Sequence, residues 1–207
     1  MNNANVPYWD ARYARQGRGT VGHVKFSPEE LDRKTQMIGN RFGASFAKYF
    51  ADRRVLDFGC GHGRMSKLLI DAGAADVQGV DVSAWAVKDA CVYEPRASFF
   101  LYAGHVLPFP DRHFNGAFTW TALQHVMNEN IKATVAEIAR VCAPGSPLMI
   151  YENTSQKPDS TYIWFRPAGL YIGMFAEHGF AEQLTQSINW IDETDEMHTL
   201  IVMEKTK

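Results

Sequence analysis

A glycine-rich stretch at residues 55–64, "VLDFGCGHGR", constrains the fold of this chain more than any other part of its sequence. An apolar run ends on Asp57 and continues into Gly59, Gly61 and Gly63, which stand at every second position. Glycines at this spacing allow a sharp turn from a strand into a helix, where bare backbone N–H groups and the positive helix end face a ligand. We therefore expect a cofactor site at this turn.

Short apolar runs alternate with amphipathic segments along the rest of the chain, a pattern typical of an α/β fold. Strands are expected at residues 54–58, 76–82, 97–102, 114–120, 146–153, 182–192 and 197–205. Helices are expected at residues 27–50, 63–72, after the cap Ser83, 129–142 and 168–179. Helices between strands imply a parallel, doubly wound sheet with right-handed crossovers, and the last two runs predict a hairpin that adds an antiparallel edge.

Length and composition favour one domain over residues 1–207, with 46% hydrophobic residues and a net charge of −2. This charge balance provides no long-range attraction to nucleic acid or to a membrane. Three cysteines without CxxC spacing, Cys60, Cys91 and Cys142, argue against disulfides or zinc and suit a reducing compartment. The first residues lack a signal-peptide pattern, and no apolar run approaches membrane-spanning length, so we expect a cytoplasmic protein without a metal.

Two acidic residues stand where neighbouring strands are expected to end. Asp57 closes the first, and Asp81, 20 residues after Gly61, closes the next. At that separation a carboxylate can bind the two hydroxyls of an adenosine ribose, so the cofactor should carry adenosine. A nicotinamide dinucleotide meets this condition, but its usual fingerprint is G-x-G-x-x-G rather than the G-x-G-x-G found here.

Four ordered motifs resemble the class I S-adenosylmethionine-dependent methyltransferases of the small bacterial type. These are "VLDFGCGHG", "VQGVDVS", "LPFPDRHFNGAFTWTALQHV" and "EIARVCAPGSPLMIYEN", which together span about residues 50–155. The resemblance implies a Rossmann-like sheet of seven strands, mostly parallel with an antiparallel last strand and helices on both faces. It also implies S-adenosyl-L-methionine as cofactor and S-adenosyl-L-homocysteine as product.

Carried over by position, the resemblance implies a set of cofactor-binding residues. In that family's pattern the glycine turn meets the methionine moiety, the second acidic residue holds the ribose, and later strand ends meet the adenine and the methionine part. The residues concerned are Asp57, Gly59, Cys60, Gly61, Gly63, Asp81, Val82, Gly104, His105 and Thr119. Two departures from the pattern are Ala103 and Asn115, each where an aspartate is common, and Ala103 leaves the adenine amino group to His105 or a backbone carbonyl.

Methyl transfer from a sulfonium needs little from the protein beyond placing the acceptor. A base is required only for a protonated acceptor such as a hydroxyl, and His125 in "LQHV" is the candidate because its unperturbed pKa lies near neutrality. Packing or hydrogen bonding after the fourth strand is the alternative role for His125.

Two segments outside the shared motifs are expected to select the substrate, and they set the boundaries within the single domain. Residues 1–28 form an N-terminal arm or lid, 29–155 the cofactor-binding core, and 156–207 a substrate-side insertion with the C-terminal hairpin. The arm is read either as a solvated flexible segment, as an aromatic staple or as a lid. Candidate substrate contacts in these segments and at the end of the fifth strand are Tyr8, Trp9, Tyr13, Tyr151, Glu152 and Arg166.

These observations together predict a methyltransferase that acts on a small-molecule acceptor, with oxygen acceptors slightly ahead of nitrogen, sulfur and carbon. Two rivals stay open at this point. One is a non-catalytic scaffold subunit that keeps the cofactor fold, which Ala103 and Asn115 would favour. The other is a nicotinamide-linked oxidoreductase.

Overall fold

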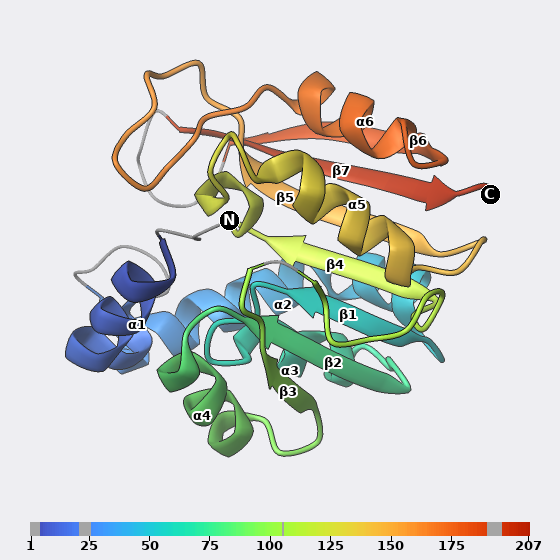
Figure 1. The fold of residues 1–207 in the computed structure, drawn as a ribbon. Coiled ribbons are helices and arrows are strands. Elements are labelled where there is room, and N and C mark those ends of the chain that lie inside the picture. Colours follow the sequence, from blue (N-terminus) through green and yellow to red (C-terminus); the bar gives the residue numbers. More distant parts are fainter. Residues whose placement is uncertain (1–4, 21–25, 105, 190–195) are drawn as a thin grey trace. The chain divides into compact units, whose positions relative to one another are not determined.

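The fold was obtained as a computed structural model, which describes residues 5–20, 26–104, 106–189 and 196–207. Its seven strands have the sheet order β3-β2-β1-β4-β5-β7-β6 (Figure 1). The pairs β1–β2, β2–β3 and β4–β5 are parallel, whereas β7 is antiparallel to both β5 and β6. This order confirms the expected Rossmann-like α/β class. The chain divides into two compact units, Met1–Pro108 and Phe109–Lys207.

The first unit places the glycine-rich turn between a buried strand and a short helix. Its strands are β1 (Arg54–Phe58), β2 (Asp76–Asp81) and β3 (Ser98–Leu101). Its helices are α1 (Asn5–Gln16), the 3-10 turn η1 (Gly17–Thr20), α2 (Pro28–Phe50), α3 (Arg64–Asp71) and α4 (Ala84–Tyr93). Strand β1 is buried at every position after the first, as expected of a parallel strand covered on both faces. Its register with β2 brings the carboxyl ends of the two strands together.

Helix α2 begins at the residues that the capping pattern indicates. The Ser27 hydroxyl accepts a hydrogen bond from the Glu30 N–H at 3.3 Å, and the Glu30 carboxylate accepts one from the Ser27 N–H at 2.6 Å. This capping box satisfies two N–H groups that a helix start otherwise leaves unpaired. Along the helix, residues three or four apart are buried, and they end with Phe46 and Phe50 at 0% exposure.

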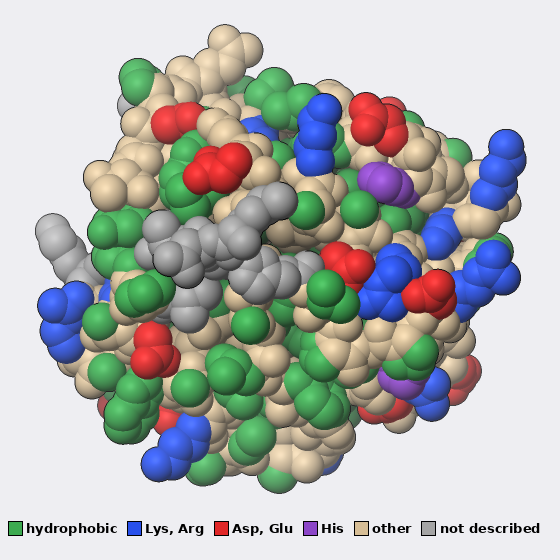
Figure 2. All heavy atoms as spheres, viewed as in Figure 1, with side chains coloured by type: hydrophobic (Ala, Val, Ile, Leu, Met, Phe, Trp, Pro, Cys, Tyr) green, Lys and Arg blue, Asp and Glu red, His purple; other side chains and the backbone are tan. Residues whose placement is uncertain are grey.

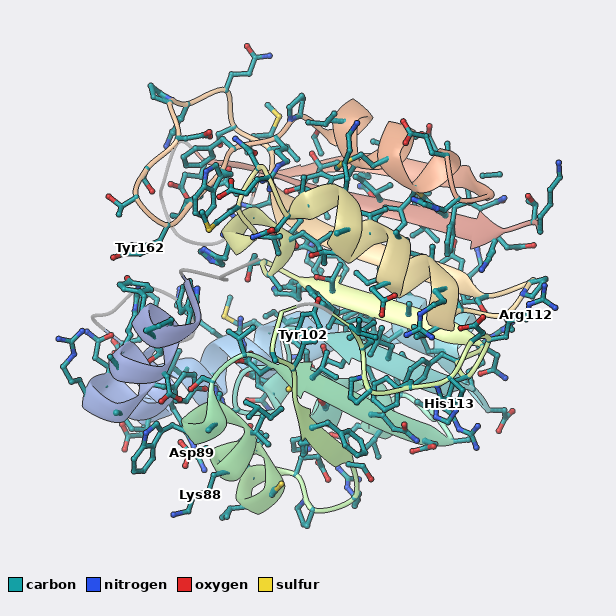
Figure 3. All side chains as sticks on the ribbon, viewed as in Figure 1. Lys88, Asp89, Tyr102, Arg112, His113 and Tyr162 are labelled. Atoms are coloured by element: carbon teal, nitrogen blue, oxygen red, sulfur yellow. The ribbon has the colours of Figure 1, made fainter. Side chains whose placement is uncertain are left out.

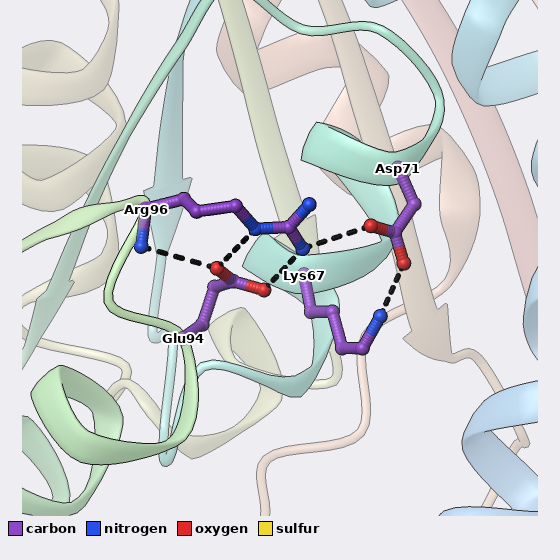
Figure 4. A network of polar contacts seen from close by, with 4 residues as sticks. All are labelled: Lys67, Asp71, Glu94 and Arg96. Carbon is purple, nitrogen blue, oxygen red and sulfur yellow. Dashed lines mark hydrogen bonds and ion pairs between the residues drawn. The ribbon is translucent and has the colours of Figure 1, made fainter.

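A network of charged side chains joins α3 to the segment between α4 and β3 (Figure 4). The Arg96 guanidinium binds Glu94 at 2.6 Å and Asp71 at 2.8 Å, and Lys67 pairs with Asp71 one helical turn away. Glu94 is 2% exposed, so its charge is balanced where water is largely excluded. The network links the segment that precedes β3 to helix α3.

The second unit consists of two parallel strands, the C-terminal hairpin and the helices that cover them. Its strands are β4 (Gly116–Trp120), β5 (Pro147–Asn153), β6 (Phe180–Asn189) and β7 (Met197–Lys205). Its helices are the 3-10 turn η2 (Leu123–His125), α5 (Ile131–Val141) and α6 (Ala168–Ala176). Buried Lys205 donates to the carbonyls of Ala139 and Cys142, which fastens β7 to the C-terminal end of α5. Residues 190–192 of the expected sixth strand lie outside the described residues.

Residues 5–20 of the N-terminal arm are not the solvated flexible segment that one reading of the sequence favoured. Its described residues form α1 and η1, and Tyr13 is 5% exposed against the rest of the first unit. Pro7 lies in the first turn of α1, where a missing N–H is tolerated. Arg12 links two turns of the helix, because its guanidinium donates to the Tyr8 hydroxyl at 2.8 Å and to the Gln16 amide oxygen at 3.2 Å.

Charges of both signs are mixed on the face of the molecule drawn in Figure 2. Lys and Arg side chains lie among Asp and Glu side chains there, in keeping with the net charge of −2. No described helix is long and apolar enough to cross a membrane.

Candidate functional site

The glycine-rich turn after β1 uses backbone conformations that only glycine adopts without strain. Gly59, Gly61 and Gly63 have φ of 74°, 54° and 85°. A Cβ at Gly63 would also lie 3.0 Å from the Phe99 ring. The prediction of a tight turn is therefore confirmed, and its glycines are required by geometry.

Four N–H groups of this turn are not bare, which corrects the expectation drawn from the sequence for these residues. Gly59 N and Cys60 N both donate to Val80 O, at 2.9 and 3.0 Å. Gly61 N donates to the Asp81 carboxylate at 3.0 Å, and Gly63 N donates to Cys60 O at 2.9 Å. A phosphate cradle needs such donors turned toward the ligand. Backbone contact from these four residues to a ligand must instead come from carbonyl groups, which attract positive charge.

Two carboxylates flank the turn, one bound to helix α3 and the other to the turn itself. Asp57 is 1% exposed and accepts the Ser66 hydroxyl at 2.6 Å. Burial raises the pKa of Asp57 to about 7, and the Ser66 hydrogen bond opposes that rise. Half-buried Asp81 accepts Gly61 N and, at 2.9 Å, Ser83 N. Since a carboxylate offers about four lone-pair positions, Asp81 keeps acceptor capacity for further donors such as two hydroxyls.

Helix α1 contacts this region through two polar residues. The Asp10 carboxylate accepts the Ser83 hydroxyl at 3.0 Å, and Ser83 in turn caps α4 by accepting Ala86 N. The Tyr13 hydroxyl lies 3.2 Å from His62 Nδ1. Burial, with the nearby Arg64 and Arg18, lowers the pKa of His62 to about 3, so the ring is neutral. The arm is therefore docked beside the glycine turn of its own unit.

The remaining cofactor candidates of the first unit lie near these groups in sequence and differ in environment. Cys60 is 4% exposed, and burial raises the pKa of its thiol, so the thiol stays protonated. Val82 is half-buried directly after β2. Gly104 follows β3 with φ of 85°, and His105 lies outside the described residues. Their roles toward a cofactor stay predictions.

In the second unit, a strained turn follows β4. Thr121 has φ of 52°, a conformation that a β-branched residue rarely adopts, and its N–H donates to Tyr151 O at 2.7 Å. Such strain persists only where surrounding contacts fix the backbone, and it is common at functional sites. The turn leads directly into η2, which carries His125.

Glu152, expected as a substrate contact, binds this turn instead. It is 0% exposed, and its carboxylate accepts the N–H groups of Ala122 at 3.0 Å, Leu123 at 2.9 Å and Gln124 at 3.1 Å. Burial raises the pKa of Glu152 to about 7, and the three N–H donors oppose that rise because they favour the charged form. The Thr119 hydroxyl lies 3.4 Å from the same carboxylate and is equally buried.

Arg166 and Tyr151, also expected to meet a substrate, are buried within the second unit. Arg166 is 2% exposed and donates to Leu123 O, Val126 O and the Asn128 side chain. Tyr151 is 1% exposed, and its ring stacks on Trp120 at 3.9 Å between centroids. Positioning and packing account for the observed contacts of both. Of the candidates on the arm, Tyr8 and Trp9 are less buried than Tyr13, and Arg12 lies over both rings.

His125 is half-buried, and its ring is held at both nitrogens. Nδ1 lies 2.7 Å from the carbonyl oxygen of Tyr162, and Nε2 lies 3.3 Å from the Gln124 amide nitrogen. A carbonyl only accepts, so Nδ1 carries the proton and Nε2 is the basic atom. The structure places Tyr162 in the loop between β5 and α6, where Figure 3 labels it.

Sequence reasoning missed several residues of these two regions. Asp10, Ser66 and Gln124 act through side-chain hydrogen bonds to residues that are not their neighbours in sequence, and Tyr162 acts through its backbone carbonyl. The sequence held one signal for the helix that carries Asp10. Tyr8, Arg12 and Gln16 stand four residues apart, a spacing that places them on one face of a helix. Among the described residues no group of three or more His, Cys, Asp or Glu is arranged to hold a metal.

Comparison with known proteins finds similarity to methyltransferases. Residues 55–145 match a family model described as a methyltransferase domain. The O-methyltransferase cnsE of Penicillium expansum is 29% identical over 160 residues, which cover 74% of this chain and 52% of that protein. The botryococcene C-methyltransferase of Botryococcus braunii is 29% identical over 140 residues, covering 65% and 35%. The chain thus spans about half or less of the length of these two relatives.

Similarity to a solved structure supports the fold alone. The PH0226 protein of Pyrococcus horikoshii OT3 matches 94% of this chain and 98% of its own, with a TM-score of 0.70 at 19% identity. The domain match and the methyltransferase relatives agree with the resemblance found in the sequence. Residues 55–145 of this chain are therefore similar to a methyltransferase domain, and the matched relatives are methyltransferases.

Proposed function

We propose that this protein binds S-adenosyl-L-methionine and transfers its methyl group to a small-molecule acceptor, with a hydroxyl oxygen as the favoured acceptor atom. The observation that carries the proposal is the hydrogen bonding of the glycine turn. The N–H groups of Gly59, Cys60, Gly61 and Gly63 are used inside the protein, which suits a cationic ligand better than a pyrophosphate. Nicotinamide dinucleotides carry a pyrophosphate, so this geometry does not favour the oxidoreductase alternative.

The residues present fit the cofactor. Its ammonium and sulfonium groups are positive, and the first unit offers the carboxylates of Asp57 and Asp81 together with the carbonyls of the glycine turn. Asp81 would hold the ribose hydroxyls with its remaining lone pairs, and Val82 would pack on the adenine. When bound, the cofactor supplies an activated methyl group for an in-line displacement.

His125 would remove the proton of a hydroxyl acceptor. The Nδ1–H bond to Tyr162 O leaves Nε2 as the basic nitrogen, which is the state that a general base requires. The relatives include both O- and C-methyltransferases. An oxygen acceptor accounts for a histidine held in this form, whereas an acceptor without an acidic proton needs no base.

A transfer assay tests the proposal. The protein is incubated with S-adenosyl-L-methionine labelled in its methyl group and with a panel of phenols, carboxylic acids, amines and thiols. We expect label in one or more hydroxyl-bearing acceptors and formation of S-adenosyl-L-homocysteine. Cofactor binding with no transfer to any class of acceptor would contradict the activity and support a scaffold role.

Replacement of His125 tests its part in the reaction. His125→Ala should lower turnover on a hydroxyl acceptor by roughly 10²- to 10⁴-fold and leave cofactor affinity nearly unchanged. The wild-type rate should rise with pH through a single inflection that the variant lacks. If the inflection persists in His125→Ala, the base is another group.

A further inference from the structure

We propose that Glu152 and Arg166 are positioning residues that hold the 121–126 turn from its two ends and thereby fix the tautomer of His125. The proposal rests on the proposed function, because the tautomer matters for catalysis only if His125 accepts a proton. It assigns a joint role to two buried, oppositely charged side chains from different parts of the second unit.

Glu152 holds the beginning of the turn. The first residues of a helical turn leave their N–H groups without partners, and here Ala122, Leu123 and Gln124 donate all three to one carboxylate. A fully buried carboxylate is costly unless hydrogen-bonded, so the charge and the turn depend on each other. The turn can shift only if Glu152 loses these donors.

Arg166 holds the end of the turn. Its Nη1 donates to Leu123 O at 3.0 Å, and its Nη2 donates to Val126 O at 2.6 Å and to Asn128 Oδ1 at 2.7 Å. The planar guanidinium fork matches two carbonyls at once, a geometry that a lysine ammonium does not reproduce. Between them, the two side chains bind N–H groups before His125 and carbonyls on both sides of it.

The loop that leads to Arg166 completes the arrangement around His125. Trp164 N donates to Gln124 O at 2.8 Å, and the His125 Nδ1–H donates to Tyr162 O at 2.7 Å. Asn153 N donates to Gln124 Oε1 at 3.0 Å, which turns the Gln124 amide nitrogen toward His125 Nε2. The contacts of the two ring nitrogens favour the tautomer with its proton on Nδ1.

Glu152 and Arg166 are both buried, and burying their charges costs desolvation free energy that apolar residues of similar volume would not cost. Thr121 adds an independent sign that the backbone is held against its preference, because its φ of 52° needs such support. The arrangement therefore fixes geometry rather than adding stability alone.

The test is a long-range ¹H–¹⁵N NMR experiment on histidine side chains, which reports the tautomer of each ring in the folded protein without any acceptor. His125→Asn identifies the signals of His125. In the wild type we expect the Nδ1-protonated form to dominate. In Glu152→Gln the amide end of glutamine faces N–H donors, so the turn shifts and the Nε2-protonated form should increase about three- to tenfold.

Matched variants decide the outcome. Glu94→Gln changes an equally buried, hydrogen-bonded glutamate of the first unit and should leave the His125 signals unchanged. Arg166→Lys and Glu152→Asp keep the charges and should shift the tautomer ratio of His125 in the same direction by a smaller factor. These two variants provide the test if Glu152→Gln does not fold. A tautomer ratio within about twofold of wild type in the folded variants, or an equal shift in Glu94→Gln, would overturn the proposal. Absence of methyl transfer would contradict the proposed function and leave this readout intact.

Discussion

At the scale of single residues, Thr121 carries backbone strain that can be measured. Holding a non-glycine residue at positive φ costs about 1–3 kcal/mol, and glycine would give back about 0.5–1 kcal/mol through its larger unfolded-state entropy. Thr121→Gly should therefore raise the free energy of unfolding in urea by about 1 kcal/mol. Asp52, with φ of 60°, is the control, because aspartate tolerates this conformation and Asp52→Gly should change stability by less than about 0.5 kcal/mol. If Thr121→Gly instead has a lower free energy of unfolding than wild type, the contacts of the Thr121 side chain outweigh the backbone strain.

The carboxyl group of Asp57 should make stability depend on pH. Its folded-state pKa of about 7 lies above its ordinary value, so the folded protein retains a proton that the unfolded chain releases. The stabilisation is complete below the ordinary pKa and is lost as pH rises through about 7. His62, whose pKa is lowered to about 3, contributes the opposite trend over part of this range. Wild type alone therefore does not isolate Asp57.

Asp57→Asn removes this titration, so the comparison with wild type isolates it. Between about pH 5 and about pH 7.5 the stability of the variant relative to wild type should increase by about 2 kcal/mol. Denaturant titrations of both proteins at several pH values measure the difference. A difference that does not change with pH would mean that Asp57 is charged throughout.

At the scale of elements, two serine caps of similar geometry should differ in consequence. Ser27 and Ser83 each accept the N–H of the third helical residue at 3.3 Å, but Ser83 is buried and also donates to Asp10 of α1. Ser27→Ala should lower the free energy of unfolding by about 1 kcal/mol. Ser83→Ala should lower it by about 2 kcal/mol, because the Asp10 carboxylate also loses its donor.

A double-mutant cycle checks whether this contact docks the arm. Ser83 and Asp10 should couple by about 0.5–1 kcal/mol, whereas Ser27 and Asp10 should be additive. Hydrogen exchange in α1 should become faster in Asp10→Ala and remain unchanged in Ser27→Ala. Unaltered exchange of α1 in Asp10→Ala would mean that Tyr13 and the aromatic contacts hold the arm by themselves.

Elements with a strong periodic pattern were predictable from the sequence, and the arm was not. The capping box at Ser27 and the buried run of β1 follow from local chemistry. Helix α1 combines aromatic, basic and proline residues without a clear apolar stripe, and it is held by contacts of Asp10 and Tyr13 with residues 49 or more positions away. Local propensity carries no information about such contacts.

At the scale of the whole molecule, the order of motifs along the chain predicted the sheet, because short βα connections leave few topologies. The site was less predictable. The glycine spacing predicted the turn, and Asp81 was correctly placed at the end of a strand, but the partners of the turn's N–H groups depend on how β2 lies beside β1. The roles of Glu152 and Arg166 depend likewise on a turn that only the folded second unit creates.

The most direct test of the central claim is calorimetric titration of S-adenosyl-L-methionine and of NAD into the wild type, Asp81→Ala and Asp76→Ala. We predict that the wild type binds S-adenosyl-L-methionine and not NAD. Asp81→Ala should bind it about 30- to 150-fold more weakly, a loss of about 2–3 kcal/mol from charged hydrogen bonds to the ribose. Asp76, at the other end of β2 and paired with Arg54, should be replaceable without effect. Binding of NAD alone, or wild-type affinity for S-adenosyl-L-methionine in Asp81→Ala, would contradict the account.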